Sequence, residues 1–222
     1  MKQSCALKKR FSKRNAIHIK RANTDLFWVE ICSYLMIIKD SEILVTLVDN
    51  TGKITGYAEK MLAHIRGDLH LAFSLMIIRR KNNQVEYLLQ RRALHKYHSG
   101  GLWANTCCSH PLPDENIQDA ARRRVSEELG ISERLSMSPI GQIQYKYQLD
   151  NNMIEHELDR ILVSEVDSVQ WRQNLAEVMD VRWWDEQELV KLLNNKPDIF
   201  AAWFPKVFEH TRQNIPQRKA SI

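Results

Sequence analysis

Short apolar runs, each bounded by polar or glycine-containing turns, recur through the middle of the chain and predict β-strands. Strands are expected at residues 43–48, 69–78, 87–90, 140–148 and 156–163, with a further extended segment at 101–108. Turn-forming residues follow the first run at 49–52. A second turn at 81–83 predicts a hairpin between the next two strands.

Helical patterns appear in three later segments. Residues 116–129 follow Pro113 and Asp114 and stop at Gly130, which is typical of the start and end of a helix. Further helices are expected at about 185–193 and 201–211. Mixed strands with a few interleaved helices predict one α/β (α+β) domain over about residues 41–213. Residues 1–40 would then be an N-terminal extension, and residues 214–222 a C-terminal tail.

The N-terminal extension is basic, since seven lysines and arginines fall within residues 8–21. A solvated, partly ordered arm is expected, with a weak contact to nucleic acid or anionic lipid as the less favoured alternative. Residues 25–36 have the spacing of a short amphipathic helix.

Composition and charge narrow the class of protein. The 222 residues are 44% hydrophobic and 27% charged, which suits a globular protein with one core. The net charge of +5 suits an anionic small molecule or a loosely bound polyanion, and it does not by itself indicate nucleic acid. The four cysteines, at 5, 32, 107 and 108, are too few for a disulfide scaffold. No apolar run approaches the roughly 20 residues of a membrane span, and a soluble cytoplasmic protein with reduced thiols is expected.

Two charged residues fall on the apolar face of the helix expected at 116–129. At about 100° per residue, Arg124 and Glu128 lie within the arc of apolar side chains. That arc comprises Ile117, Ala120, Ala121, Val125 and Leu129. A buried carboxylate needs a partner. Either the two charges form an ion pair at the edge of the core, or Glu128 holds a divalent cation while Arg124 faces the anion that this cation neutralises.

A thiol, a hydroxyl and an imidazole fall within residues 105–111. Cys108 and His110 are two positions apart, so both side chains point to the same face if this segment is extended. A thiol beside a metal-bound or charged imidazole can be tuned as an acid or a nucleophile. Alternatively, Cys107 and Cys108 are small buried residues and His110 is a satisfied polar one.

The charged helix and the loop before it resemble the signature of the Nudix superfamily. That signature is a Gly, then a Glu, then Arg-Glu-x-x-Glu-Glu-x-Gly on a loop, helix and loop. The residues in matching register are Glu115, Arg123, Glu127, Glu128 and Gly130. The chain departs from the signature at two positions. It has Ser109 where the signature has Gly, and Arg124 where the signature has Glu. Loss of an acid at this position argues against pyrophosphate hydrolysis.

Further motifs resemble the type 1 isopentenyl diphosphate isomerases, a Nudix family. They lie at 69–74, 89–93, 101–111 and 155–157, and the resemblance covers about residues 41–213. It implies a Nudix-type mixed sheet flanked by helices in a single compact domain. It also implies a metal-dependent isomerase of isoprenoid biosynthesis, which moves a C=C bond between isopentenyl and dimethylallyl diphosphate. A Nudix pyrophosphohydrolase acting on a small diphosphate is the first alternative, and a non-catalytic metal- or RNA-binding protein is the second.

The resemblance implies two metal sites. A site for Zn²⁺ or Mn²⁺ (or Mg²⁺) would comprise His64, His70, His110, Glu155 and Glu157, a donor set that suits these cations better than Ca²⁺. A separate Mg²⁺ would bind Glu128 together with the substrate diphosphate. Substrate contacts would come from Lys60, Arg92, Lys96, Ser109 and Arg124.

The resemblance also implies the residues that carry the reaction. Cys108 and Glu157 would act as acid and base on opposite sides of the hydrocarbon, and Tyr145 would assist proton delivery. The ring of Trp203 would lie against a carbocation; the alternative is a plain core or lid aromatic. The expected partner is the small diphosphate substrate, without nucleic acid or a membrane span, and the expected state is a monomer or weak dimer.

Overall fold

The computed structural model describes residues 43–82, 84–149 and 152–215. The basic arm, the helix expected at 25–36 and most of the expected tail lie outside these residues. In the described part, no helix is both long enough and apolar enough to cross a membrane.

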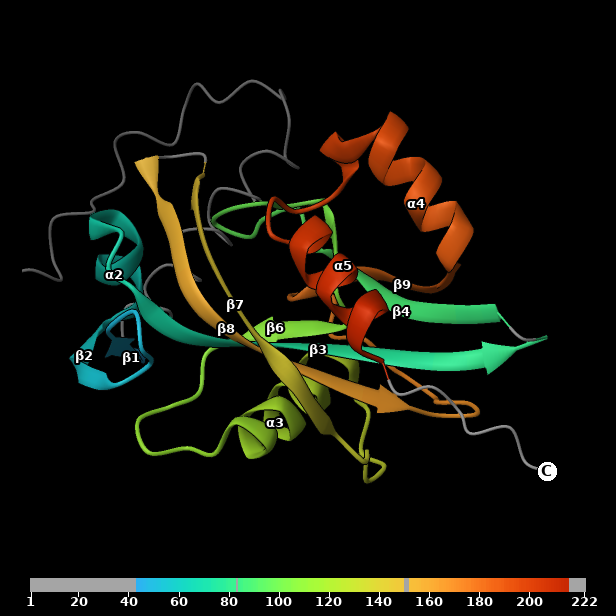
Figure 1. Cartoon of the computed structure of the whole chain (residues 1–222), viewed down its shortest axis with the longest axis horizontal. Helices are drawn as coiled ribbons and strands as arrows, with labels where there is room; N and C mark the ends of the chain where they lie inside the picture. Colours follow the sequence, from blue (N-terminus) through green and yellow to red (C-terminus); the bar gives the residue numbers. More distant parts are fainter. Residues whose placement is uncertain (1–42, 83, 150–151, 216–222) are drawn as a thin grey trace, which may run out of the picture.

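Within the described residues, nine strands form one mixed sheet (Figure 1). The strands are β1 (Leu44–Val48), β2 (Ile54–Glu59), β3 (His70–Lys81), β4 (Gln84–Arg92), β5 (Trp103–Ala104), β6 (Cys107–Ser109), β7 (Ser138–Gln148), β8 (Ile154–Glu165) and β9 (Val178–Asp185). Strand β3 is central, because it pairs antiparallel with β1, β4 and β6 and parallel with β8. The outer pairs β7 with β8, β4 with β9 and β1 with β2 are antiparallel.

Helices cover both faces of the sheet (Figure 1). They are α2 (Lys60–Arg66), α3 (Ile117–Leu129), α4 (Glu186–Asn195) and α5 (Phe204–Asn214), with a 3-10 turn η2 (Pro197–Ile199). Helix α3 packs against β3 and β6 on one face, whereas α5 packs against β7 and β8. The expectation of a mixed sheet flanked by helices in one domain is therefore confirmed.

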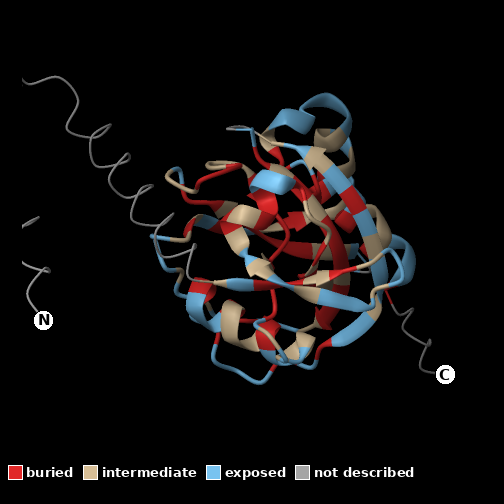
Figure 2. Cartoon of the chain, turned by 90° about the vertical axis from the view of Figure 1, so that its left-hand side faces the viewer, coloured by how far each residue is buried: buried red, intermediate tan, exposed pale blue. Residues whose placement is uncertain are grey.

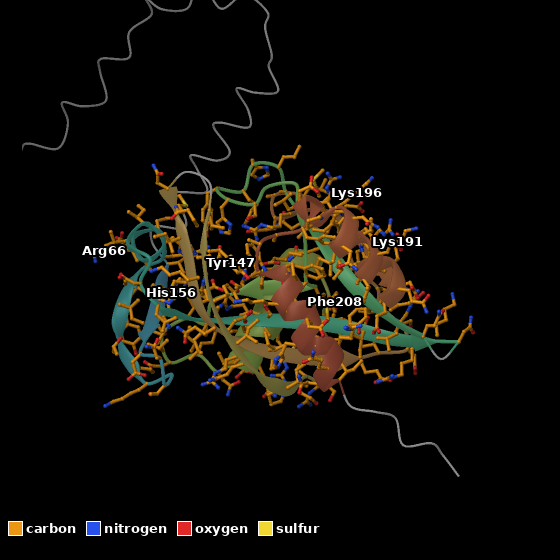
Figure 3. All side chains as sticks on the ribbon, turned by 45° about the horizontal axis from the view of Figure 1, so that its top comes forward. Arg66, Tyr147, His156, Lys191, Lys196 and Phe208 are labelled. Atoms are coloured by element: carbon orange, nitrogen blue, oxygen red, sulfur yellow. The ribbon has the colours of Figure 1, made fainter. Side chains whose placement is uncertain are left out.

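Strand β3 separates two apolar cores because successive side chains point to opposite faces. Phe73 and Leu75 pack with the inner face of α3. Met76 and Ile78 pack with α5, including Phe208, which Figure 3 labels on that helix. Figure 2 shows buried residues gathered inside the molecule, with exposed residues on the outer parts of the helices and strands.

The structure differs from the expected elements in three places. Strand β2 and helix α2 were not predicted, since β2 is largely exposed and α2 has only seven residues. The segment 101–108 is not one strand but is split into β5 and β6. There the Thr106 hydroxyl accepts a hydrogen bond from the backbone N–H of Ile77 (2.8 Å). Helix α5 begins at Phe204 and continues to Asn214, so the first residue of the expected tail is helical.

Gly130 ends α3 as the sequence predicts, and its replacement is expected to be costly. Its φ is 63°, and an added Cβ would lie 2.6 Å from the carbonyl oxygen of Arg172. Gly130→Ala should therefore lower the free energy of unfolding by at least about 1–2 kcal/mol, the usual left-handed penalty. Urea unfolding measures this loss, with Ser132→Ala at a neighbouring exposed position as the control. An unchanged midpoint for Gly130→Ala would contradict the prediction.

Candidate active site and metal centre

One pocket brings together most of the side chains singled out in the sequence. Its lining comes from α2, α3, the strands β4, β6 and β8, the residues between β4 and β5, and the residues just after β6, just before β9 and just before α5. It consists of Lys60, Gln90, Arg92, Lys96, Tyr97, His98, Cys108, Ser109, His110, Arg124, Glu128, Glu155, Glu157, Glu177 and Trp203. His64, His70 and Tyr145 are buried residues that contact this lining.

Strand register aligns the central residues of the site. His70 on β3 is opposite Glu157 on the parallel strand β8. Tyr145 on β7 is opposite the same Glu157 on its other side, and the Tyr145 hydroxyl donates to Glu157 Oε2 (2.6 Å). Cys108 on β6 is opposite Ser74 of β3. Pairing between strands thus brings together residues that are far apart in sequence.

Three imidazoles and one carboxylate converge closely enough to hold a cation. The candidate ligand atoms of His64, His70, His110 and Glu157 all lie within 4.8 Å of one another. His110 Nε2 is 2.9 Å from Glu157 Oε1 and 3.1 Å from His70 Nε2. Such crowding of acceptor atoms is what a bound cation would resolve.

The backbone fixes the orientation of two of these imidazoles. Nδ1 of His64 donates to the carbonyl oxygen of Lys60 (2.7 Å), and Nδ1 of His70 donates to that of Asp68 (2.8 Å). Each Nε2 is then left with a lone pair, the form that ligates a metal. His64 Nε2 is buried without a hydrogen-bond partner. This orphaned atom shows that the residues fit a cation.

Glu155 falls in a second set of possible ligands, which overlaps the first through His64. Its carboxylate groups with His64 and His98, all three buried, with candidate ligand atoms within 4.8 Å of one another. His156, between the two glutamates, faces the other way as the alternation predicts. Its Nδ1 lies 2.9 Å from the carbonyl oxygen of Gly67, toward the helix whose Arg66 is labelled in Figure 3.

Burial disfavours the charged form of His64 and of His110. It lowers the pKa of His64 to about 3, with His70 and His110 adding to the effect. It also lowers the pKa of His110 to about 4, although the hydrogen bond with Glu157 opposes this shift. Burial raises the pKa of Glu157, but the contacts of its carboxylate with the His110 and His70 side chains outweigh this effect and hold the pKa well below its usual range. Neutral imidazole and ionised carboxylate are the forms that bind metal.

Of the two sequence interpretations of Arg124 and Glu128, the ion pair is confirmed, and a divalent cation on Glu128 stays a prediction. Arg124 Nη2 is 2.6 Å from Glu128 Oε1, so the ion pair is present. Both residues also line the pocket, with Glu128 only 4% exposed. Gln90 lies in the motif at 89–93 but was not singled out as a site residue. It donates to the other carboxylate oxygen of Glu128 (3.0 Å).

Glu177, an acidic residue that the sequence analysis did not single out, pairs with the cations on the positive side of the pocket. Glu177 Oε2 lies 2.7 Å from Lys96 Nζ and 3.7 Å from Arg124 Nη2. Burial raises the pKa of Glu177, but these two cations outweigh it and lower the pKa overall. Glu115 of the Nudix-like signature instead pairs with Arg123 at 2.7–2.8 Å, which fastens the loop to α3.

The two adjacent cysteines lie on opposite faces of β6. Cys107 is fully buried in the core under α3, whereas Cys108 contacts the other core and lines the pocket. Both thiols are free. Burial raises the pKa of Cys108, with Arg92 opposing and nearby glutamates reinforcing the shift, so the thiol is neutral.

Trp203 is both a core residue and part of the pocket wall. Its side chain is 1% exposed, and its indole Nε1 donates to Asn105 Oδ1 (3.3 Å). The guanidinium of Arg92 lies 5.4 Å from the centre of its ring, within the usual range of a cation–π contact. The ring is therefore held in one orientation against a cationic group.

Comparison with known proteins agrees with this geometry. A family model described as the NUDIX domain matches residues 68–204. The isopentenyl-diphosphate Delta-isomerase of Photobacterium profundum is 45% identical over 175 residues, covering 79% of this chain and 96% of the relative. The protein of that name from Pectobacterium atrosepticum is 43% identical over 164 residues, covering 74% and 88%.

Solved structures resemble the fold at low identity. The Deinococcus radiodurans protein DR0079 is 12% identical with a TM-score of 0.61, covering 78% of this chain and 99% of that one. The NUDIX domain of Shewanella oneidensis NrtR is 16% identical with a TM-score of 0.51, covering 66% and 88%. These likenesses support the fold alone. From the domain match and the relatives above 40% identity, the chain belongs to the Nudix superfamily and, within it, to the isopentenyl-diphosphate Delta-isomerases.

Proposed function

We propose that this chain interconverts isopentenyl diphosphate and dimethylallyl diphosphate by adding a proton at one carbon and removing one at another. The observation that carries the proposal is that Cys108 and Glu157 line one pocket, with the aromatic wall of Trp203 beside them. The reaction is the one that the names of the relatives describe.

The chemistry explains why these groups are needed together. An unactivated alkene must be protonated at its terminal carbon, and the adjacent methylene must lose a proton. Cys108 and Glu157 are the acid–base pair for these two transfers, and Tyr145 hydrogen-bonds to Glu157 Oε2. A tertiary carbocation lies between the steps, and the Trp203 ring would stabilise it by about 2 kcal/mol.

The metal centre belongs to the same proposal. His64, His70, His110, Glu157 and Glu155 would hold Zn²⁺ or Mn²⁺, since imidazole and carboxylate donors suit these cations. The bound cation would fix the Glu157 carboxylate and tune its basicity. Glu128 would share a Mg²⁺ with the substrate diphosphate.

The positive side of the pocket would bind the diphosphate. Lys60, Arg92, Lys96 and Arg124 all line it, together with Ser109. The diphosphate is remote from the reacting carbons, so its binding energy serves to orient and desolvate the prenyl end. The cytoplasmic location and the monomeric or weakly dimeric state stay predictions.

Incubation with isopentenyl diphosphate and Mg²⁺ in deuterated water tests the reaction. Deuterium is expected in a methyl group of dimethylallyl diphosphate, because the acid exchanges its proton with solvent before delivering it to carbon. Phosphate release without an allylic product would instead support a pyrophosphohydrolase. Arg124, at the acidic position of the Nudix signature, argues against that outcome.

Substitution at Trp203 tests its contact with the carbocation. Trp203→Ala should lower kcat by about 30-fold, which corresponds to about 2 kcal/mol, whereas Trp203→Phe retains a ring and should lose less. Steady-state kinetics on both variants measure the difference. Trp184→Phe, in the same core but outside the pocket lining, is the matched control. A smaller loss of kcat in Trp203→Ala than in Trp203→Phe would contradict the contact between the Trp203 ring and the carbocation.

A further inference from the structure

His98 is a buried imidazole within the site that the proposed mechanism does not use. It lies between β4 and β5 and is 5% exposed. Its ring stacks with that of His64 at a centroid distance of 6.0 Å and meets the Trp203 ring edge-on at 5.7 Å. His98 therefore stands between the metal centre and the aromatic wall of the pocket.

Two side chains that lie within ligand distance of His98 each carry a buried polar atom without a partner. His64 Nε2 and Glu155 Oε2 are both buried without a hydrogen-bond partner. His98 Nε2 is 3.6 Å from Glu155 Oε2, beyond hydrogen-bond distance. Leaving buried acceptors unpaired is destabilising. A cation among these three side chains would satisfy both orphaned atoms.

The ring nitrogens can adopt the protonation that such a site requires. Nδ1 of His64 donates to the carbonyl oxygen of Lys60, which leaves Nε2 as a lone-pair donor. Nδ1 of His98 is 3.3 Å from the Ser99 hydroxyl. With the proton on Nδ1, the Nε2 of His98 is likewise a lone-pair donor beside Glu155.

We propose that His98 is a further ligand of the buried cation, at a second position that it shares with His64 and Glu155. His64 is common to both ligand sets. Because its Nε2 binds one cation at a time, the two positions are alternatives and not a two-metal centre. This second position offers two imidazole nitrogens and one carboxylate, a donor set that suits Zn²⁺ better than Mg²⁺.

Crystals of the full chain loaded with one equivalent of Zn²⁺, without substrate, test the assignment directly. We expect anomalous density at the zinc edge within about 2.1 Å of His98 Nε2. Density confined to His70, His110 and Glu157, with His98 Nε2 out of ligand range, would overturn it. This experiment does not depend on the folding of any variant.

Zinc affinity provides the second measurement, by competition with a chromophoric chelator. His98→Ala and His98→Gln should both weaken binding by at least about tenfold. The control is His95→Ala, three residues away, whose Nε2 lies 2.9 Å from the carbonyl oxygen of Ala176. Unchanged affinity in folded His98 variants would also overturn the proposal.

This inference rests on the metal centre of the proposed function, but the two can fail separately. If zinc is bound by the other ligands without His98, and the protein still incorporates deuterium into dimethylallyl diphosphate, only the role of His98 is removed. Zinc at His98 in a protein that forms no labelled product supports the ligand assignment and removes only the isomerase reaction.

Discussion

Replacing Cys108 with alanine is expected to lower kcat by about 10²–10⁴-fold, the usual contribution of a positioned acid or base. The thiol lines the pocket with Glu157 and Trp203, so its loss leaves one of the two proton transfers without a partner. KM should change far less, because the cations that would bind the diphosphate are untouched. Steady-state kinetics of isopentenyl diphosphate conversion measure both constants.

The neighbouring thiol is the matched control for Cys108. Cys107 lies on the opposite face of β6, in the core beneath α3. Cys107→Ala removes one buried sulfur there and should retain most of the wild-type kcat. Equal loss of activity in the two variants would contradict a separate role for Cys108. Near-normal turnover in Cys108→Ala would remove it from the mechanism.

Glu157→Gln is expected to reduce kcat by a comparable or larger factor, about 10²–10⁴-fold for proton transfer alone. The amide keeps the size of the side chain and an oxygen to accept from the Tyr145 hydroxyl, but it cannot take up a proton. It also removes the charge that faces His70 and His110. Metal content should therefore be measured beside the kinetics.

Glu165→Gln on the same strand is the control, since Glu165 pairs with Arg80 and lies outside the pocket lining. Loss of turnover in Glu157→Gln with full metal content would assign the carboxylate to proton transfer. Loss of both would assign it to metal binding as well. Wild-type turnover with normal metal content in Glu157→Gln would contradict the proposed role of Glu157 in proton transfer.

Local sequence predicted the elements that have strong periodicity or strong stop signals. The helix at 116–129, its end at Gly130 and the central strand are examples, because a repeating apolar pattern reports which side is buried. Helix α2 escaped prediction because seven residues are too few to show a period. It nevertheless carries Lys60 and His64 into the site.

The candidate residues were found by motif, whereas their neighbours were not. Cys108, His110, Glu155 and Glu157 stand in short specific segments. His98 and Glu177 have no such context, and Gln90 was not singled out within its motif at 89–93. All three join the site through contacts across 38 or more positions of the chain. No local pattern encodes such contacts, because they arise only when β4, β8 and α3 are packed together.

The sequence by itself determined the family, the mixed fold, and the thiol, imidazoles and carboxylates that the chemistry needs. The tertiary structure alone decided which of them meet. Strand register places His70 and Tyr145 on either side of Glu157, and β6 turns Cys108 into the pocket and Cys107 away from it. The physical reason is that side-chain identity is local, whereas ligand geometry, burial and the protonation that burial imposes depend on segments far apart in the chain.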